Sequence, residues 1–176
     1  MEIELTGFSN RWEKEYLEEK NHLVTMFGSE IIAIEHVGST AIPIDLAKPV
    51  IDIFIAVEPF RNHEHYSMCF GAGDYRYTVT GMIGRHLFQK YSGENWTHNI
   101  HILGYTTEFH HRNEILFRDF IKDKKDLMQE YSLLKKMLTV STTDIEEYTK
   151  GKTAFIQKVV DMARKEKGLP LVSVWE

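Results

Sequence analysis

The feature that most constrains this chain is a glycine–serine pair between two apolar segments. Residues 30–37 have the composition of a β-strand, and Gly38-Ser39-Thr40 follow at once. Residues 50–57 predict a second strand, which carries one carboxylate, Asp52. Backbone N–H groups in a tight Gly-Ser turn can bind phosphate oxygens, and a carboxylate on a strand can bind a metal ion. Together the two segments predict a site for phosphate chemistry.

Side-chain alternation along the second strand separates Asp52 from the main apolar layer. Val50, Asp52, Phe54 and Ala56 share one face, and the aliphatic residues at 51, 53, 55 and 57 share the other. We expect the aliphatic face in the core and Asp52 on the side of the Gly-Ser turn. The alternative is a structural aspartate that pairs with Lys48 or with backbone groups. Pro43 limits any helix that begins at Ser39 to about one turn.

The rest of the chain predicts a single α+β domain over residues 1–176. A helix is expected from Asn10, as its cap, to Gly28, and a second from Pro59 to residue 70. Strands are expected at 75–80, 86–91 and 97–103. Helices fill the last third, where a capping box at Thr143 opens one final helix. The expected architecture is a mixed β-sheet with flanking helices and a helical C-terminal third.

Composition narrows the partners and the compartment. The chain has 21 basic and 26 acidic residues and a net charge of −5, which argues against general nucleic-acid or anionic-membrane binding. Its one cysteine, Cys69, excludes an internal disulfide and a cysteine-based zinc cluster. No apolar run approaches the roughly 20 residues of a membrane span, and residues 1–4 are unlike a signal peptide. We therefore expect a cytoplasmic protein of unspecified oligomeric state.

Several blocks of the sequence resemble the GrpB family. They are residues 36–43, 47–53, 73–77, 99–102, 117–120, 130–135 and 148–156, which span nearly the whole chain in order. The family is grouped with the nucleotidyltransferase superfamily by its fold. The resemblance therefore implies a nucleotidyltransferase-like fold with a site around Gly38, Ser39 and Asp52.

The resemblance and the charges suggest a role for each candidate residue. Gly38 and Ser39 would hold phosphates, Lys48 would offset their charge, and Asp52 would act with Ser39 in catalysis and hold Mg²⁺, with Mn²⁺ as a substitute. The expected partner is a nucleotide or another phosphorylated small molecule, to which a nucleotidyl group is added or from which it is taken. Further candidate substrate-binding residues are His36, Arg85, Lys90, His101, Arg118 and Lys152.

One departure from the superfamily's pattern keeps a second interpretation open. Active nucleotidyltransferases usually carry two carboxylates two residues apart, but here Phe54 occupies the second position. Residues 97–103 offer Asn99 and His101 on one face and His98 on the other, but no acid. Among nearby acids, Glu35 is the best placed to replace the missing carboxylate. The alternative function is a catalytically degenerate nucleotide-, metabolite- or protein-binding domain, with a link to coenzyme A metabolism because related domains occur fused to dephospho-CoA kinase.

Overall fold

The structure is a computed structural model that describes residues 5–44 and 46–174. These residues form two compact units. The sheet unit comprises Asn10–Ala41 and Val50–Phe109. The helical unit comprises the described parts of Met1–Ser9, Ile42–Pro49 and His110–Glu176. The single domain stays a prediction.

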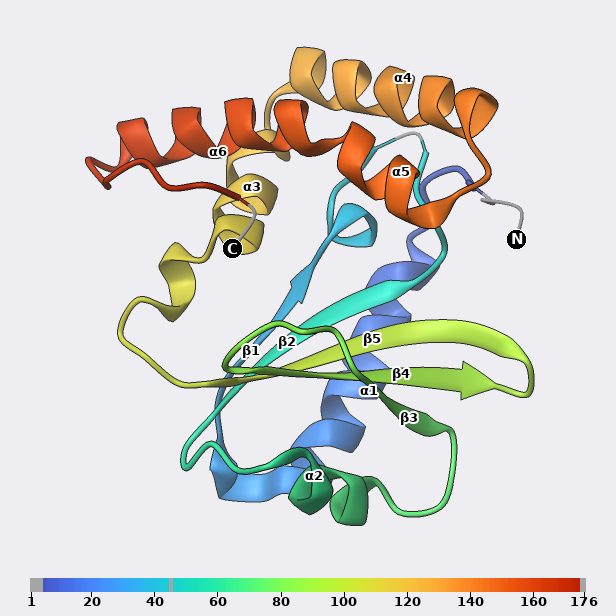
Figure 1. Cartoon of the computed structure of the whole chain (residues 1–176), viewed down its shortest axis with the longest axis vertical. Coiled ribbons are helices and arrows are strands. Elements are labelled where there is room, and N and C mark those ends of the chain that lie inside the picture. Colours follow the sequence, from blue (N-terminus) through green and yellow to red (C-terminus); the bar gives the residue numbers. More distant parts are fainter. Residues whose placement is uncertain (1–4, 45, 175–176) are drawn as a thin grey trace. The chain divides into compact units, whose positions relative to one another are not determined.

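The sheet unit is built on a five-stranded mixed sheet, as the sequence predicts. The strands lie in the order β1-β2-β5-β4-β3, with β2 and β5 parallel and every other pair antiparallel (Figure 1). Their bounds are Ile31–Val37 for β1, Ile51–Val57 for β2, Tyr75–Thr78 for β3, Arg85–Ser92 for β4 and Asn95–Gly104 for β5. The parallel pairing brings β5 beside β2, so that the strand carrying Asp52 is an interior strand between β1 and β5.

Two helices, α1 (Arg11–Phe27) and α2 (His63–Phe70), cover the aliphatic face of the sheet. On α1, Tyr16 stacks on His36 of β1 with ring centroids 4.8 Å apart. On α2, Phe70 packs against Phe88 of β4 at 4.7 Å. The strand register places His36 and Phe88 on the same face as Ile53 and Ile100, which are fully buried. Asp52 therefore lies on the opposite face, as alternation predicts.

The helix starts differ from the expected ones. The backbone of Asn10 is already helical and its side chain caps nothing, although α1 does end at Gly28. The second helix begins at His63 rather than at Pro59, because the Asn62 side chain accepts a hydrogen bond from the His65 N–H at 3.2 Å. A side-chain oxygen that accepts from the first turn thus marks the start of α2, whereas α1 begins without such a cap.

The helical unit contains α3 (Asn113–Ile121), α4 (Lys125–Ser141), α5 (Ile145–Gly151) and α6 (Thr153–Glu166). The expected final helix is thus two helices, and Asp144 rather than Thr143 caps the first by accepting from Glu147 N–H at 2.8 Å. Apolar residues from three helices and from the 42–49 segment form the core: Ile42, Ile44, Leu116, Phe117, Phe120, Tyr131, Phe155, Val159 and Val160. Over the described part of the chain, no helix is long and apolar enough to span a bilayer.

Candidate functional site

The turn after β1 brings the backbone of Gly38 against the carboxylate of Asp52. Val37, the last residue of β1, is paired with Asp52 on β2. Gly38 has a φ of +74°, and a Cβ atom there would lie 2.3 Å from Asp52 Oδ2. Only glycine permits both the left-handed backbone and this close approach. The turn continues into a single 3₁₀ turn, Ser39–Ala41, which is the short helix expected before Pro43.

Contacts of His36 and Thr40 also hold this turn in place. The Nε2 atom of His36 lies 2.9 Å from the Thr40 hydroxyl, which donates to the Val50 carbonyl at 3.3 Å. His36 also stacks on Tyr16 of α1, so its ring lies on the helix-covered face and not beside Asp52. The structure therefore gives His36 the position of a residue that fixes the turn. His36 was predicted to contact substrate, but its ring is on the face of the sheet opposite Asp52.

Asn99 orients the Asp52 carboxylate. The two residues are directly paired on β2 and β5, and Asn99 Nδ2 donates to Asp52 Oδ1 at 2.8 Å. The indole N–H of Trp96, which can only donate, lies 3.1 Å from Asn99 Oδ1. The same indole N–H also lies 3.2 Å from the His98 carbonyl. Because an ionised carboxylate can only accept, the amide turns its N–H group toward Asp52. One carboxylate oxygen is thus held by Asn99, and the other faces Gly38.

Phe54 lies two residues along β2 from Asp52, on the same face, and carries a cation on its ring. Its side chain is 2% exposed, and the guanidinium carbon of Arg85 lies 4.9 Å from the ring centroid. His101, the residue paired with Phe54 on β5, meets the ring edge-on at 5.1 Å. Glu35 is paired with Phe54 on β1 and so belongs to the same face. The face therefore combines two acids with an arginine, a histidine and an amide.

Of the carboxylates on this face, Asp52 is the one that could hold a metal ion. Among residues 5–44 and 46–174, no group of three or more His, Cys, Asp or Glu side chains is placed to hold a metal ion. Mg²⁺ is typically held by one or two carboxylates together with substrate phosphates, and Asp52 can supply one. The neighbours of Asp52 on this face, Phe54 on β2 and Asn99 on β5, carry no carboxylate that could join it in holding two metal ions.

The other predicted residues do not belong to this face of the sheet. Lys90 is on the helix-covered face, where it pairs with the buried Glu19 of α1. Lys48, Arg118 and Lys152 belong to the helical unit. There Arg118 Nε is 2.9 Å from Asp119 Oδ1, and the ammonium of Lys152 lies 4.5 Å from the centre of the Tyr148 ring. Of the candidates in the sheet unit, Arg85 and His101 are on the same face of the sheet as Asp52.

The contacts of Trp96 and Arg85 escape sequence reasoning. Trp96 acts through Asn99, and Arg85 acts across β5, so neither contact follows from local spacing. The signal that points to them is the parallel pairing of β2 with β5. Once that pairing is known, the register puts Asn99 beside Asp52 and His101 beside Phe54.

The five-stranded mixed sheet, its flanking helices and the helical C-terminal part place the protein in the α+β class. The family model described as "GrpB protein" matches residues 2–162, so the chain belongs to the GrpB family. Glutamate-rich protein GrpB of Alkalihalophilus pseudofirmus is 31% identical over 91% of this chain and 95% of its own length. UPF0157 protein YqkA of Bacillus subtilis is 34% identical over 94% of this chain, which spans about half (48%) of that protein.

Solved structures share the fold. The crystal structure of the conserved protein GrpB from Enterococcus faecalis superposes with a TM-score of 0.84 at 27% identity, covering 94% of this chain and 99% of that one. A chain from the structure of the GLD-2/RNP-8 complex gives a TM-score of 0.52 at 8% identity, over 97% of this chain and 64% of that one. The second likeness concerns the fold alone.

Proposed function

We propose that this GrpB-family protein binds a nucleotide or another phosphorylated small molecule at the Asp52 face of its sheet. The observation that carries the proposal is the contact between Gly38 and the Asp52 carboxylate. It joins a turn suited to phosphate oxygens with a carboxylate suited to a cation.

The proposal includes a cation that is bound to the ligand's phosphates, for an electrostatic reason. A phosphate bound at Gly38 and Ser39 would lie close to the negative charge of Asp52, and two like charges repel strongly outside bulk water. A Mg²⁺ ion carried by the ligand's phosphates removes that repulsion, and Mn²⁺ can replace it. Asn99 donates to one Asp52 oxygen, and the other oxygen faces Gly38, on the side where the phosphates and their ion would bind.

Nucleotidyl transfer is the stronger form of the same proposal. In it, the turn holds the phosphates, Asp52 holds the cation, and Ser39 orients the phosphates through its hydroxyl. Bound Mg²⁺ would supply neutralisation of the phosphate charge. Phe54 removes the second carboxylate on which two-metal transfer depends, so we place binding before catalysis.

A thermal-unfolding panel tests the proposal. The full chain is heated with nucleotides and coenzyme A precursors, each with and without Mg²⁺. A ligand at 100 times its Kd adds about 2.7 kcal/mol of stability, and each kcal/mol shifts Tm by roughly 2–4 °C in a chain of this size. We expect a magnesium-dependent shift in the unchanged protein and none in Asp52→Asn.

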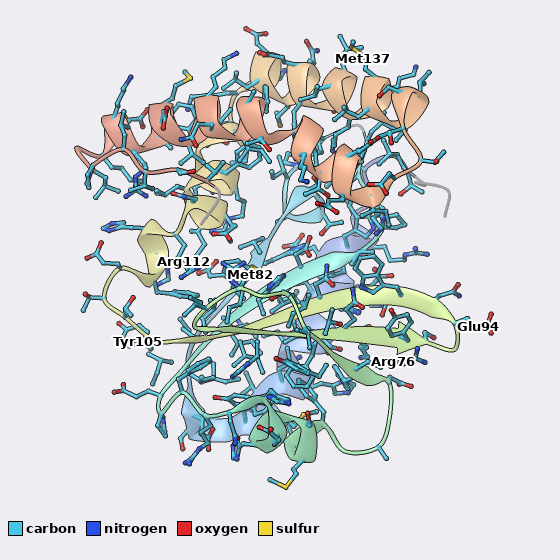
Figure 2. All side chains as sticks on the ribbon, in the orientation of Figure 1. Arg76, Met82, Glu94, Tyr105, Arg112 and Met137 are labelled. Atoms are coloured by element: carbon cyan, nitrogen blue, oxygen red, sulfur yellow. The ribbon has the colours of Figure 1, made fainter. Side chains whose placement is uncertain are left out.

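The matched control is Glu94→Gln, which removes the same charge from the tip of the β4–β5 hairpin (Figure 2). It should keep the full shift, because Glu94 is exposed and lies outside the Asp52 row of the sheet. A panel with no shift for any phosphorylated compound would contradict the proposal and favour the protein-interaction alternative. Equal shifts in the protein and in Asp52→Asn would contradict the role given to Asp52.

A further inference from the structure

A row of polar residues runs from Asp52 across the sheet to β3. Asp52 on β2 is paired with Asn99 on β5. Asn99 is paired in turn with Gln89 on β4, and Gln89 with Arg76 on β3. Directly paired residues lie on one face of a sheet, so the whole row belongs to the Asp52 face. Gln89 is two strand spacings from Asp52, about 9–10 Å, which is comparable to the separation between the base and the phosphates of a nucleotide.

The amide of Gln89 is held through its oxygen. The hydroxyls of Thr78 and Tyr91 each donate to Gln89 Oε1 at 3.2 Å. In the described part of the chain the Nε2 group of Gln89 meets no acceptor, and it is not one of the enclosed polar atoms. Gln89 therefore offers a hydrogen-bond donor to a molecule that lies over β4.

Arg76 offers further donors beside Gln89. The residue is exposed, and its guanidinium carbon lies 4.3 Å from the centre of the Tyr91 ring (Figure 2). None of the described residues forms an ion pair with it. A guanidinium is planar and always charged, and it carries donors but no acceptor. The two side chains together thus form a set of donors, and a ligand that meets them needs acceptors on the same edge.

The two purine bases differ at such an edge. Guanine presents two acceptors, N7 and O6, whereas adenine presents the acceptor N7 and the amino donor N6. A guanidinium that donates to N7 and O6 is the commonest specific contact made to guanine in nucleic-acid recognition. With adenine one of these donors would face an amino group, and its hydrogen bond would be lost.

We propose that Arg76 and Gln89 are specificity-determining residues that bind the base of the ligand and select a purine with acceptors at both N7 and O6. Guanine and hypoxanthine nucleotides have this chemistry. The inference rests on the proposed function and names the substrate class of the same site. The phosphates bind at the Gly38 turn with their cation at Asp52, and the base lies over β4 and β3.

Calorimetric titration of the full chain with guanosine, inosine and adenosine diphosphates, each with Mg²⁺, tests the inference. The three compounds share the ribose and the two phosphates and differ in the base. The guanosine and inosine compounds should bind within about threefold of each other. Both should bind on the order of 10- to 100-fold more tightly than the adenosine compound.

Two variants test the residues. Arg76→Ala should weaken guanosine diphosphate binding about tenfold or more and change adenosine diphosphate binding by less than about threefold. In Gln89→Glu one carboxylate oxygen can still accept from Thr78 and Tyr91, while the other replaces the donor by an acceptor. This variant should reduce the preference for the guanosine compound at least about tenfold. A change of preference is a result that a merely structural role would not produce.

Arg61→Ala is the matched control. Arg61 is also a half-exposed arginine of the sheet unit, but it pairs with Glu30 at 3.6 Å, and its carbonyl contacts His86 on the helix-covered face. Its loss should leave the affinity for all three compounds within about twofold. Thermal unfolding of each variant shows whether it is folded, so that a change in binding reports on the site.

The outcomes separate the two proposals. If the adenosine compound binds as tightly as the other two, or if Arg76→Ala and Gln89→Glu leave the preference unchanged, the inference is overturned while the proposed function stands. If the unchanged protein binds none of the three compounds and no other phosphorylated compound, the proposed function fails, and the inference fails with it.

Discussion

At Gly38 the backbone and a neighbouring side chain require the same residue. Its φ of +74° disfavours any side chain, and the Asp52 carboxylate occupies the space that a Cβ atom would need. The collision is with Oδ2 of a residue whose other oxygen is held by Asn99, so the carboxylate cannot easily turn away. Gly38 therefore sets the distance between the turn and Asp52.

We predict that Gly38→Ala destabilises the protein and abolishes ligand binding. Backbone strain and the collision with Asp52 should together cost about 2–4 kcal/mol of unfolding free energy. Urea unfolding measures the loss, and the thermal-shift panel measures binding at a temperature where the variant is folded.

Gly93→Ala is the control for backbone strain alone. Gly93 has a φ of +62° in the β4–β5 hairpin, and nothing lies within 4 Å of a Cβ atom built there. This variant should lose about 1 kcal/mol and keep its binding. Equal losses of stability in the two alanine variants, with binding kept in both, would show that Asp52 yields to the extra methyl group.

Individual residues divide into those that local sequence reveals and those that it hides. The Gly-Ser turn and the position of Asp52 on the face opposite the aliphatic residues follow from composition and alternation, which are local properties. The partners of Asp52 and Phe54 do not, because Asn99 and Arg85 reach them through strand pairings 47 and 31 residues away. The placements of His36 and Lys90 on the helix-covered face depend on the same pairings.

Among the elements, α1 is fixed to the sheet by a buried carboxylate. Glu19 is 2% exposed, accepts a hydrogen bond from the Tyr75 hydroxyl of β3 at 2.6 Å, and pairs with Lys90 of β4. Burial and the hydrogen bond to Glu19 raise the pKa of Tyr75, so its hydroxyl remains a donor at all ordinary pH values. One helix is thereby tied to two strands.

We predict that Glu19→Gln strongly lowers the free energy of unfolding. The change leaves the ammonium of Lys90, whose side chain is 19% exposed, without its compensating charge. Removing one partner of a buried ion pair typically costs about 3–5 kcal/mol, and the partial exposure of Lys90 puts the expected loss near the lower end. Urea unfolding with circular dichroism measures it.

Glu15→Gln provides the comparison on the same helix. Glu15 pairs with Arg11 at 2.9 Å on an open surface, where the arginine side chain is 71% exposed. Such pairs contribute about 0–1 kcal/mol, so this variant should be nearly as stable as the unchanged protein. A loss from Glu19→Gln no larger than the loss from Glu15→Gln would contradict the role given to Glu19.

Element types were easier to predict than element ends. Hydrophobic periodicity gives the five strands and the helical last third, because each pattern is set by which face is buried. The starts of α2 and α5 depend on single side-chain caps, Asn62 and Asp144. The break between α5 and α6 depends on close packing. At Gly151 a Cβ atom would lie 2.4 Å from Leu138 Cδ2, a tertiary contact that no periodicity reveals.

For the molecule as a whole, the division into units shows the limit of local reasoning. The core of the helical unit combines Ile42 and Ile44 with helices that begin some seventy residues later, at Asn113. The segment that follows the Gly-Ser turn therefore leaves the sheet unit before the chain returns at Val50. Periodicity reports the burial of a residue but not the partner that buries it.

A buried lysine in the helical unit makes stability depend on pH. Lys135 is 1% exposed, donates from Nζ to the Leu46 carbonyl, and lies 4.6 Å from the centre of the Tyr131 ring. Burial, together with the charge of Lys152, lowers the pKa of Lys135 to about 7. Between pH 7 and its ordinary value of about 10.4, the unfolded chain therefore binds more protons than the folded one.

Stability contributed by this group should accordingly rise with pH across that interval. Comparison with Lys135→Met isolates it, because methionine keeps most of the volume and has no proton to lose. We predict that the unfolding free energy of the unchanged protein, relative to Lys135→Met, increases by up to about 1.4 kcal/mol per pH unit between pH 7.5 and 9.5. A difference that does not change with pH would contradict the lowered pKa.

The most direct test of the central claim is a calorimetric titration of the full chain with the nucleotide that gives the largest shift in the panel. Each titration is run with and without Mg²⁺, on the unchanged protein and on Asp52→Asn. We predict saturable binding by the unchanged protein only when Mg²⁺ is present, and at least tenfold weaker binding by Asp52→Asn. Equal affinity in the two proteins, or no heat of binding in either, would contradict a nucleotide site at the Gly38–Asp52 contact.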